Sequence, residues 1–154
     1  MAKERITENI IIENARLIFK NFGGEASKYN RKGDRNFCVV IDDPEQAQGL
    51  ANDGWNIKRL DPRDEDDEPT YYITVKVNFD NEPIPVINMV TSITKKKTQL
   101  FEDTVQCLDY SRILTADVII KPYNWEVNGK TGVSAYLQTL YVMIEEDPFA
   151  YKYE

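Results

Sequence analysis

Aromatic and basic side chains share the water-facing side of two segments in this sequence. Within residues 71–79 every second residue is apolar, which leaves Tyr72 and Lys76 on the opposite face. Three later residues of one parity repeat the combination: Lys121, Tyr123 and Trp125. Aromatic faces stack on nucleic-acid bases and cations neutralise phosphates, so these residues, with Trp55 and Lys58, predict a surface for single-stranded nucleic acid. The alternative is that the aromatic rings only cover the end of a barrel.

A basic loop is predicted over residues 28–35, which read KYNRKGDR. Gly33 gives this segment freedom, and four of its residues combine one aromatic ring with three cations: Tyr29, Arg31, Lys32 and Arg35. We expect the loop to contact phosphates, because loops on a β scaffold commonly carry function. A solvated hairpin tip fits the same residues. The lysine run at 95–97 is compatible with nucleic-acid contact or with plain exposure.

The net charge of −7 is unevenly distributed along the 154 residues. Residues 61–68, DPRDEDDE, carry a net charge of −5, and residues 145–154, EEDPFAYKYE, carry −3. The rest of the chain is left with +1. A basic surface can therefore coexist with acidic appendages.

The residue types argue against an enzyme. Histidine is absent, which removes the commonest general base and zinc ligand. Cys38 and Cys107 lie in apolar surroundings with no CxxC spacing, and residues 61–68 lack the glycine and spaced glutamate of a calcium loop. We expect no metal and no cofactor. Two alternatives stay open: an interaction or inhibitor protein that uses its acidic surface, and a metal-dependent nuclease with scattered carboxylates.

The periodicity predicts one domain, mainly β. Strands are expected at residues 10–19, 36–41, 71–79, 113–125 and 133–144, with an edge strand at 86–90 after two prolines and an extended segment at 55–60. Asn128-Gly129 predicts a hairpin between the last two strands. Residues 44–52 begin with proline after two aspartates, which predicts one short helix. Residues 100–110 are ambiguous.

Two segments resemble a known family. Residues 116–144, ADVIIKPYNWEVNGKTGVSAYLQTLYVMI, and residues 36–58, NFCVVIDDPEQAQGLANDGWNIK, are similar to phage single-stranded DNA-binding proteins with an OB fold. The resemblance implies an OB-type five-stranded barrel with additional strands or hairpins and one short helix. It also implies protection of single-stranded DNA without strong sequence preference, during phage DNA replication or recombination. By position, it places five residues in or beside the binding surface: Trp55, Lys58, Lys121, Tyr123 and Trp125.

The last residues resemble the acidic tails with which such proteins recruit partners. We therefore divide the chain into a binding domain, residues 1–144, and an acidic tail, residues 145–154, that would reach replication or recombination proteins. The tail departs from the family pattern because five residues follow Phe149. The expected partner is single-stranded DNA, and a homo-oligomer stays open. No apolar run approaches the roughly 20 residues that cross a bilayer, so we expect a protein of the bacterial host cytoplasm.

Overall fold

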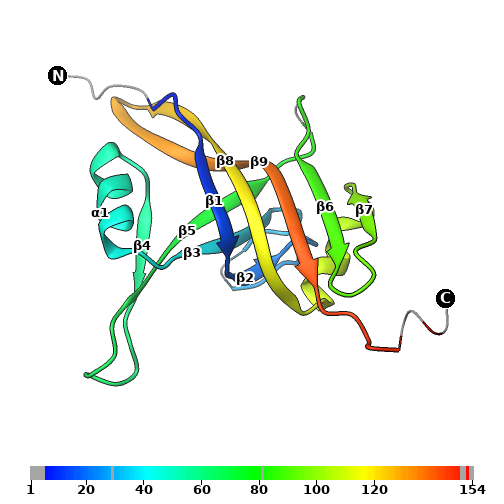
Figure 1. Cartoon of the computed structure of the whole chain (residues 1–154). Coiled ribbons are helices and arrows are strands. Elements are labelled where there is room, and N and C mark those ends of the chain that lie inside the picture. Colours follow the sequence, from blue (N-terminus) through cyan, green and yellow to red (C-terminus); the bar gives the residue numbers. More distant parts are fainter. Residues whose placement is uncertain (1–5, 29, 81, 150–151, 153–154) are drawn as a thin grey trace.

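The computed structural model describes residues 6–28, 30–80, 82–149 and 152, and it is mainly β, as predicted (Figure 1). One nine-stranded sheet forms the body, with an α-helix and a 3₁₀-helix beside it. In chain order the elements are β1 (Ile10–Ala15), β2 (Leu17–Asn21), β3 (Arg35–Ile41), α1 (Pro44–Asp53), β4 (Ile57–Leu60), β5 (Thr70–Val77), β6 (Val86–Thr91), β7 (Lys97–Leu100), η1 (Val105–Tyr110), β8 (Ile113–Val127) and β9 (Lys130–Ile144).

The long hairpin of β8 and β9 is the centre of the sheet (Figure 1). Its two-residue turn has left-handed backbone at Asn128, with φ of 52°, and at Gly129, with φ of 80°. Such a turn matches the twist of the strands that it joins, and the Asn-Gly pair favours it. The predicted hairpin is confirmed.

The strands form a branched sheet rather than the closed five-stranded barrel that the resemblance implied. The main order is β1-β8-β9-β5-β3-β2, and in the described chain β1 and β2 are not hydrogen-bonded to each other. β9 is long enough to take two parallel neighbours on one edge, β5 at Tyr136 and β6 from Thr139 to Ile144. β6 also pairs with β7, so the prediction that residues 86–90 form an edge strand was wrong. Pro83 and Pro85 precede the ladder and do not interrupt it.

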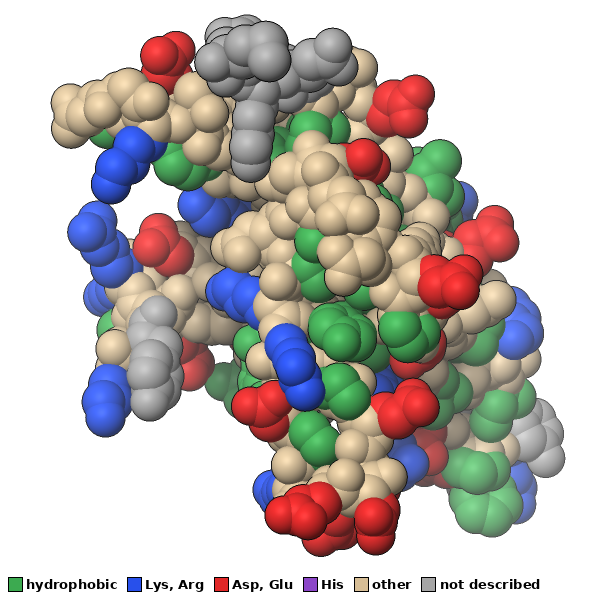
Figure 2. All heavy atoms as spheres, turned by 90° about the vertical axis from the view of Figure 1, so that its left-hand side faces the viewer, with side chains coloured by type: hydrophobic (Ala, Val, Ile, Leu, Met, Phe, Trp, Pro, Cys, Tyr) green, Lys and Arg blue, Asp and Glu red, His purple; other side chains and the backbone are tan. Residues whose placement is uncertain are grey.

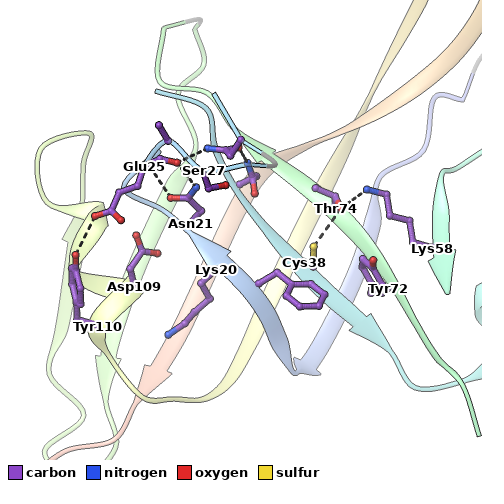
Figure 3. A pocket seen from close by; sticks show the side chains of 14 residues that line it. Lys20, Asn21, Glu25, Ser27, Cys38, Lys58, Tyr72, Thr74, Asp109 and Tyr110 are labelled. Carbon is purple, nitrogen blue, oxygen red and sulfur yellow. Dashed lines mark hydrogen bonds between the residues drawn. The ribbon is translucent and has the colours of Figure 1, made fainter. Parts of the chain in front are cut away.

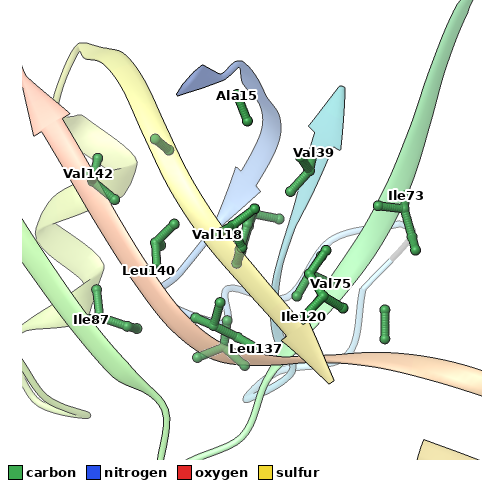
Figure 4. Close-up of a cluster of buried hydrophobic side chains, with 14 of the residues drawn as sticks. Ala15, Val39, Ile73, Val75, Ile87, Val118, Ile120, Leu137, Leu140 and Val142 are labelled. Atoms are coloured by element: carbon green, nitrogen blue, oxygen red, sulfur yellow. The ribbon is translucent and has the colours of Figure 1, made fainter. Parts of the chain in front are cut away.

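The apolar core lies on one face of this sheet (Figure 4). On β5 the alternation is as predicted: Ile73, Val75 and Val77 are buried in the core, whereas the side chains between them lie on the other face. The facing strands contribute most of the remaining core, including Val39, Val118, Ile120, Leu137, Leu140 and Val142. The residues between the core positions are therefore free to form a second, polar face.

The predicted helix is present as α1. The Asp43 carboxylate accepts a hydrogen bond from the Glu45 amide, and Pro44 opens the first turn. Gly54, with φ of 111°, ends the helix in the left-handed conformation, which glycine adopts without steric cost. The expected extended segment follows as β4. The ambiguous residues 100–110 begin with the last residue of β7 and end with η1.

The expected single strand at residues 10–19 is two strands that separate at Arg16. β1 pairs with β8, but β2 pairs with β3 at the other end of the strand order. The chain must therefore change direction between them. Bulges accompany the change, with left-handed backbone at Asn14, φ of 54°, and at Phe19, φ of 50°. The apolar residues on both sides of Glu13, Asn14 and Arg16 suggested one continuous strand from the sequence.

Candidate nucleic-acid interface

A groove of about 840 Å³ lies over β2, β3 and β5, on the face opposite the core (Figure 3). At one end Tyr72 and Lys58 stand on neighbouring strands, and at the other Tyr110 projects from η1. Tyr72 pairs with Val40 on one side and with Lys58 on the other, which fixes its place in the ladder. The groove therefore has an aromatic side chain near each end and a cation beside the first.

Two further hollows continue this groove across the sheet. The second, of about 370 Å³, shares Asn36 and Thr74 with the first and extends to Lys76 and Tyr136. The third, of about 320 Å³, shares Tyr136 with the second and extends to Tyr123 and Lys121. We call the three hollows together the aromatic track. It crosses β2, β3, β5, β9 and β8, and Lys58 of β4 lies at its edge.

Tyr136 is the junction of the track. The Lys76 ammonium lies 5.8 Å from the centroid of its ring, and the Tyr123 ring packs edge-on against it with centroids 5.7 Å apart. Tyr123 is 58% exposed, so much of its surface stays open to a ligand. A cation above one ring and a second ring beside it form a surface suited to a base and its phosphate.

Lysine side chains of the track are available to a ligand. Among the described residues the ion pairs are Arg59–Asp61 and Arg112–Glu145, so no described carboxylate neutralises Lys58, Lys76 or Lys121. Lys58 donates a hydrogen bond of 3.2 Å to the Thr74 hydroxyl at the groove floor. Unpaired ammonium groups beside aromatic rings favour binding of an anionic strand.

A buried thiol forms part of the groove floor. Cys38 and Thr74 are hydrogen-bonded at 3.3 Å on facing strands. Burial raises the pKa of the Cys38 thiol more than the Thr74 hydrogen bond and the nearby Lys58 lower it. The thiol is therefore held in its neutral form and adds no charge to the groove.

Trp125 extends the same face towards the hairpin tip. It lies opposite Gly132, two residues along β8 from Tyr123. The indole packs so closely against this glycine that a Cβ built on Gly132 would overlap the ring. With 37% of its surface exposed, Trp125 keeps one side open.

The basic loop is near the track, and its predicted residues differ in their roles. Arg31 and Lys32 are exposed, but the Arg35 guanidinium donates to the Phe22 carbonyl at 2.7 Å and lies over the Phe79 ring. Arg35 therefore stabilises the loop base while it lines the second hollow. Tyr29 lies outside the described residues.

Asn30 holds the basic loop together. Its side-chain amide donates to the carbonyls of Glu25, Arg31 and Asp34 at 2.9–3.0 Å, and its oxygen accepts from Asn36 at 2.9 Å. One side chain therefore connects both ends of the loop to β3. Arg31 and Lys32 are exposed between Asn30 and Gly33, which line the track, but neither of them lines it in the described structure.

Trp55, which was predicted to lie in or beside the binding surface, is buried in the structure. It is 5% exposed and belongs to the apolar core, although it borders a hollow of about 170 Å³ beside Lys58 and Lys76. Its amide donates to the Leu50 carbonyl at the end of α1, which turns the chain inwards. With its ring mostly buried, Trp55 lies beside this hollow rather than open to it, and its contact with DNA stays a prediction.

Two aromatic residues of the track were not predicted. Phe19 lines the first groove with its ring against Tyr72, and Tyr136 joins the second hollow to the third. Tyr136 shares its parity with Ser134 and Gly132, which could have marked it as a residue of the open face. Phe19 gave no such signal, because it follows two apolar residues.

None of the described residues of the two acidic segments, 61–68 and 145–149, lines the track. Figure 2 shows acidic side chains gathered at the lower end of the molecule, where Figure 1 places the loop between β4 and β5. In the terminal segment, Glu146 accepts hydrogen bonds from the amides of Ile93 and Thr94 and from the Thr94 hydroxyl. Glu145 donates its amide to the Arg112 carbonyl at 2.8 Å. The first two residues of the acidic segment are thus anchored to the sheet.

The part of the chain that the structure describes has no group of three or more cysteine or acidic side chains arranged to hold a metal ion. None of its helices is long and apolar enough to cross a membrane. The chemistry that remains on this face is stacking, hydrogen bonding and phosphate neutralisation, which defines a binding protein for single-stranded nucleic acid.

Comparison with known proteins gives the family. The model described as "Putative phage ssDNA-binding domain" matches residues 1–154, and the chain belongs to this family of phage ssDNA-binding domains. The C-terminally truncated single-stranded DNA-binding protein of bacteriophage Enc34 has a similar fold, with a TM-score of 0.55, 11% identity, and coverage of 97% of this chain and 99% of that one. The same phage protein in complex with ssDNA gives a TM-score of 0.51 and 11% identity, covering 92% of this chain and 89% of that one. No curated protein matches the sequence.

Proposed function

We propose that this protein binds single-stranded DNA along the aromatic track and thereby protects it. The observation that carries the proposal is the arrangement of Tyr72, Lys76, Tyr136 and Tyr123 on one continuous polar face, opposite the core. Family membership and a similar fold that has been observed with ssDNA support it.

Each residue type of the track has a separate role in this proposal. Tyr72, Tyr123 and Tyr136 stack on bases, while Lys58, Lys76 and Lys121 neutralise phosphates, with Arg31 and Lys32 approaching from the loop. Stacking accepts every base, so binding has little sequence preference. The role that fits is coating of exposed strands during phage replication or recombination, in the cytoplasm of the bacterial host.

The finer architecture belongs to the same proposal. We infer that β1, β3, β5, β8 and β9 act as an OB-type barrel to which β4 and the β6–β7 hairpin are added. Residues 1–144 form the binding domain, and residues 145–154 form an acidic segment. The partners of this segment are replication or recombination proteins, or a second copy of the chain. The protein acts without catalysis, metal or cofactor.

A competition titration tests the proposal. Labelled oligo-dT is bound to the full chain at several salt concentrations, and unlabelled single strand or duplex of the same length is added. We expect single strand to displace the label far better than duplex. A matched pair of variants locates the site. Lys58→Ala weakens binding, whereas Arg59→Ala leaves it unchanged, because the Arg59 guanidinium lies 3.2 Å from the Asp61 carboxylate just after β4. Equal competition by both DNA forms, or no binding at low salt, contradicts the proposal.

A further inference from the structure

The Phe19 side chain lies on the groove face of β2, although alternation along the strand would place it on the core face. Leu17 pairs with Val39, a core residue, and Ile18 pairs with Cys38, on the groove face. Strict alternation would return Phe19 to the core side. Instead the ring is 58% exposed and lines the groove, against Tyr72.

A β-bulge causes this reversal. Between Ile18 and Asn21 the strand advances three residues while β3 advances two, from Cys38 to Asn36. Phe19 takes left-handed backbone in the bulge, with φ of 50°. This conformation is uncommon for any residue with a side chain and an outlier for a bulky one. Bulges are known to redirect side chains next to functional sites.

The bulge is fixed on its other side by Lys20. The Lys20 ammonium donates to the carbonyl of Leu108 at 2.9 Å and to that of Ser111 at 2.7 Å, at the end of η1. With Lys20 held there, Phe19 is presented to the groove by a rigid backbone. Its ring meets Tyr72 edge-on, with centroids 5.7 Å apart and planes at 69°.

We propose that Phe19 is a base-stacking residue and that the β2 bulge exists to present it, so that Phe19 and Tyr72 together hold one end of the bound strand. A base that stacks on Phe19 meets the Tyr72 ring at its edge, with Lys58 beside Tyr72 for the phosphate. The proposal rests on the proposed function, since it adds a residue to the same site. A residue that served only the fold would gain nothing from an exposed ring on unfavourable backbone.

The backbone conformation makes Phe19→Gly a sharp test, because glycine adopts left-handed backbone without steric cost. We expect this variant to keep or raise the melting temperature and to bind oligo-dT about 5- to 150-fold more weakly, as for the loss of one stacked base. Phe19→Trp should bind at least half as tightly as the unchanged protein. Asn14→Gly is the matched control, because it places glycine at another left-handed bulge position outside the track, and it should leave binding unchanged.

A second measurement uses the unchanged protein, in case Phe19→Gly folds poorly. Oligo-dT that carries photoreactive 5-iodouracil is irradiated with the full chain, and crosslinked peptides are mapped. Crosslinks to Phe19 support the proposal, and crosslinks confined to other residues overturn it. A folded Phe19→Gly protein with unchanged affinity also overturns it. If the unchanged protein binds no single strand at all, the proposed function fails instead; if Lys58→Ala weakens binding but Phe19→Gly does not, only the role of Phe19 fails.

Discussion

The Lys76 ammonium lies 5.8 Å from the centre of the Tyr136 ring, at the one residue pair that joins β5 and β9 in parallel. The pairing brings together two halves of the track that are distant in sequence. On the β5 side are Tyr72 and Lys76, and on the β9 side Tyr136 leads to Tyr123. The affinity for DNA should therefore depend strongly on this junction.

Removal of the ring at the junction should weaken binding most clearly. We expect Tyr136→Ala to cost about 1–3 kcal/mol of binding free energy for oligo-dT, because it removes a stacking face and the contact that orients Lys76. Tyr141→Ala is the matched control, since Tyr141 is an exposed tyrosine of the same strand outside the track. Fluorescence anisotropy measures both. Similar losses in the two variants would show that the track is not the binding surface.

The basic loop should be visible in the salt dependence of binding. Each phosphate contact to a single strand contributes about 0.7 to the slope of log affinity against log salt. We expect Arg31→Ala and Lys32→Ala each to reduce the slope by about this amount. Arg59→Ala should leave the slope unchanged because its charge is paired with Asp61. Slopes identical to that of the unchanged protein would exclude loop contact with phosphate.

A methyl group at Gly132 should displace Trp125. The added Cβ would lie 2.4 Å from an indole carbon, so the ring must move away from its strand. We expect Gly132→Ala to lower stability by about 1–3 kcal/mol and to change the fluorescence of Trp125. Gly49→Ala is the counterpart, because nothing lies within 4 Å of its added Cβ in α1, and it should raise stability by about 0.5–1 kcal/mol. Thermal melts compare the two; an unchanged Gly132→Ala melt and spectrum would contradict the packing.

The Glu146 carboxylate should stabilise the turn at residues 92–94 in a pH-dependent way. The hydrogen bond from the Thr94 amide, aided by the Thr94 hydroxyl and the Ile93 amide, lowers the pKa of Glu146 below its ordinary value. Its stabilisation is therefore fully present above the ordinary glutamate pKa and is lost as the pH falls through the lowered value. We expect Glu146→Gln to lower the melting temperature at neutral pH, by less in acid. A difference that is constant from pH 7 to pH 3 would refute this.

Two truncations should separate the anchored residues from the rest of the acidic segment. A chain that ends after Glu146 keeps the hydrogen bonds to Arg112 and Thr94, so its melting temperature should match that of the full chain. A chain that ends after Ile144 loses them and should melt earlier. If residues 147–154 compete with DNA for the track cations, the first truncation should also bind DNA more tightly at low salt. This gain in affinity should disappear at physiological salt, where charges further apart than a Debye length of about 8 Å are screened from each other. Equal melting temperatures for the two truncated chains would show that Glu145 and Glu146 do not stabilise the fold.

Local patterns in the sequence were enough for several elements. The alternation at residues 71–79 separated core from open face because side chains of a strand point to opposite sides, and it identified Tyr72 and Lys76. Asn128-Gly129 determined the hairpin because both residues tolerate left-handed backbone, and Asp43-Pro44 determined the start of α1. Each of these features depends on residues a few positions apart.

Only the tertiary structure decided how the pieces of the track meet. The parallel contact between Lys76 and Tyr136, the burial of Trp55 and the interior position of β6 depend on which strands become neighbours, and sequence spacing does not encode this. The bulge at Phe19 shows the same limit locally: its apolar neighbours predict a continuous strand, whereas pairing with β3 forces one extra residue and turns the ring outwards. Residue types thus determined the chemistry available to this protein, and long-range strand pairing decided where that chemistry is gathered.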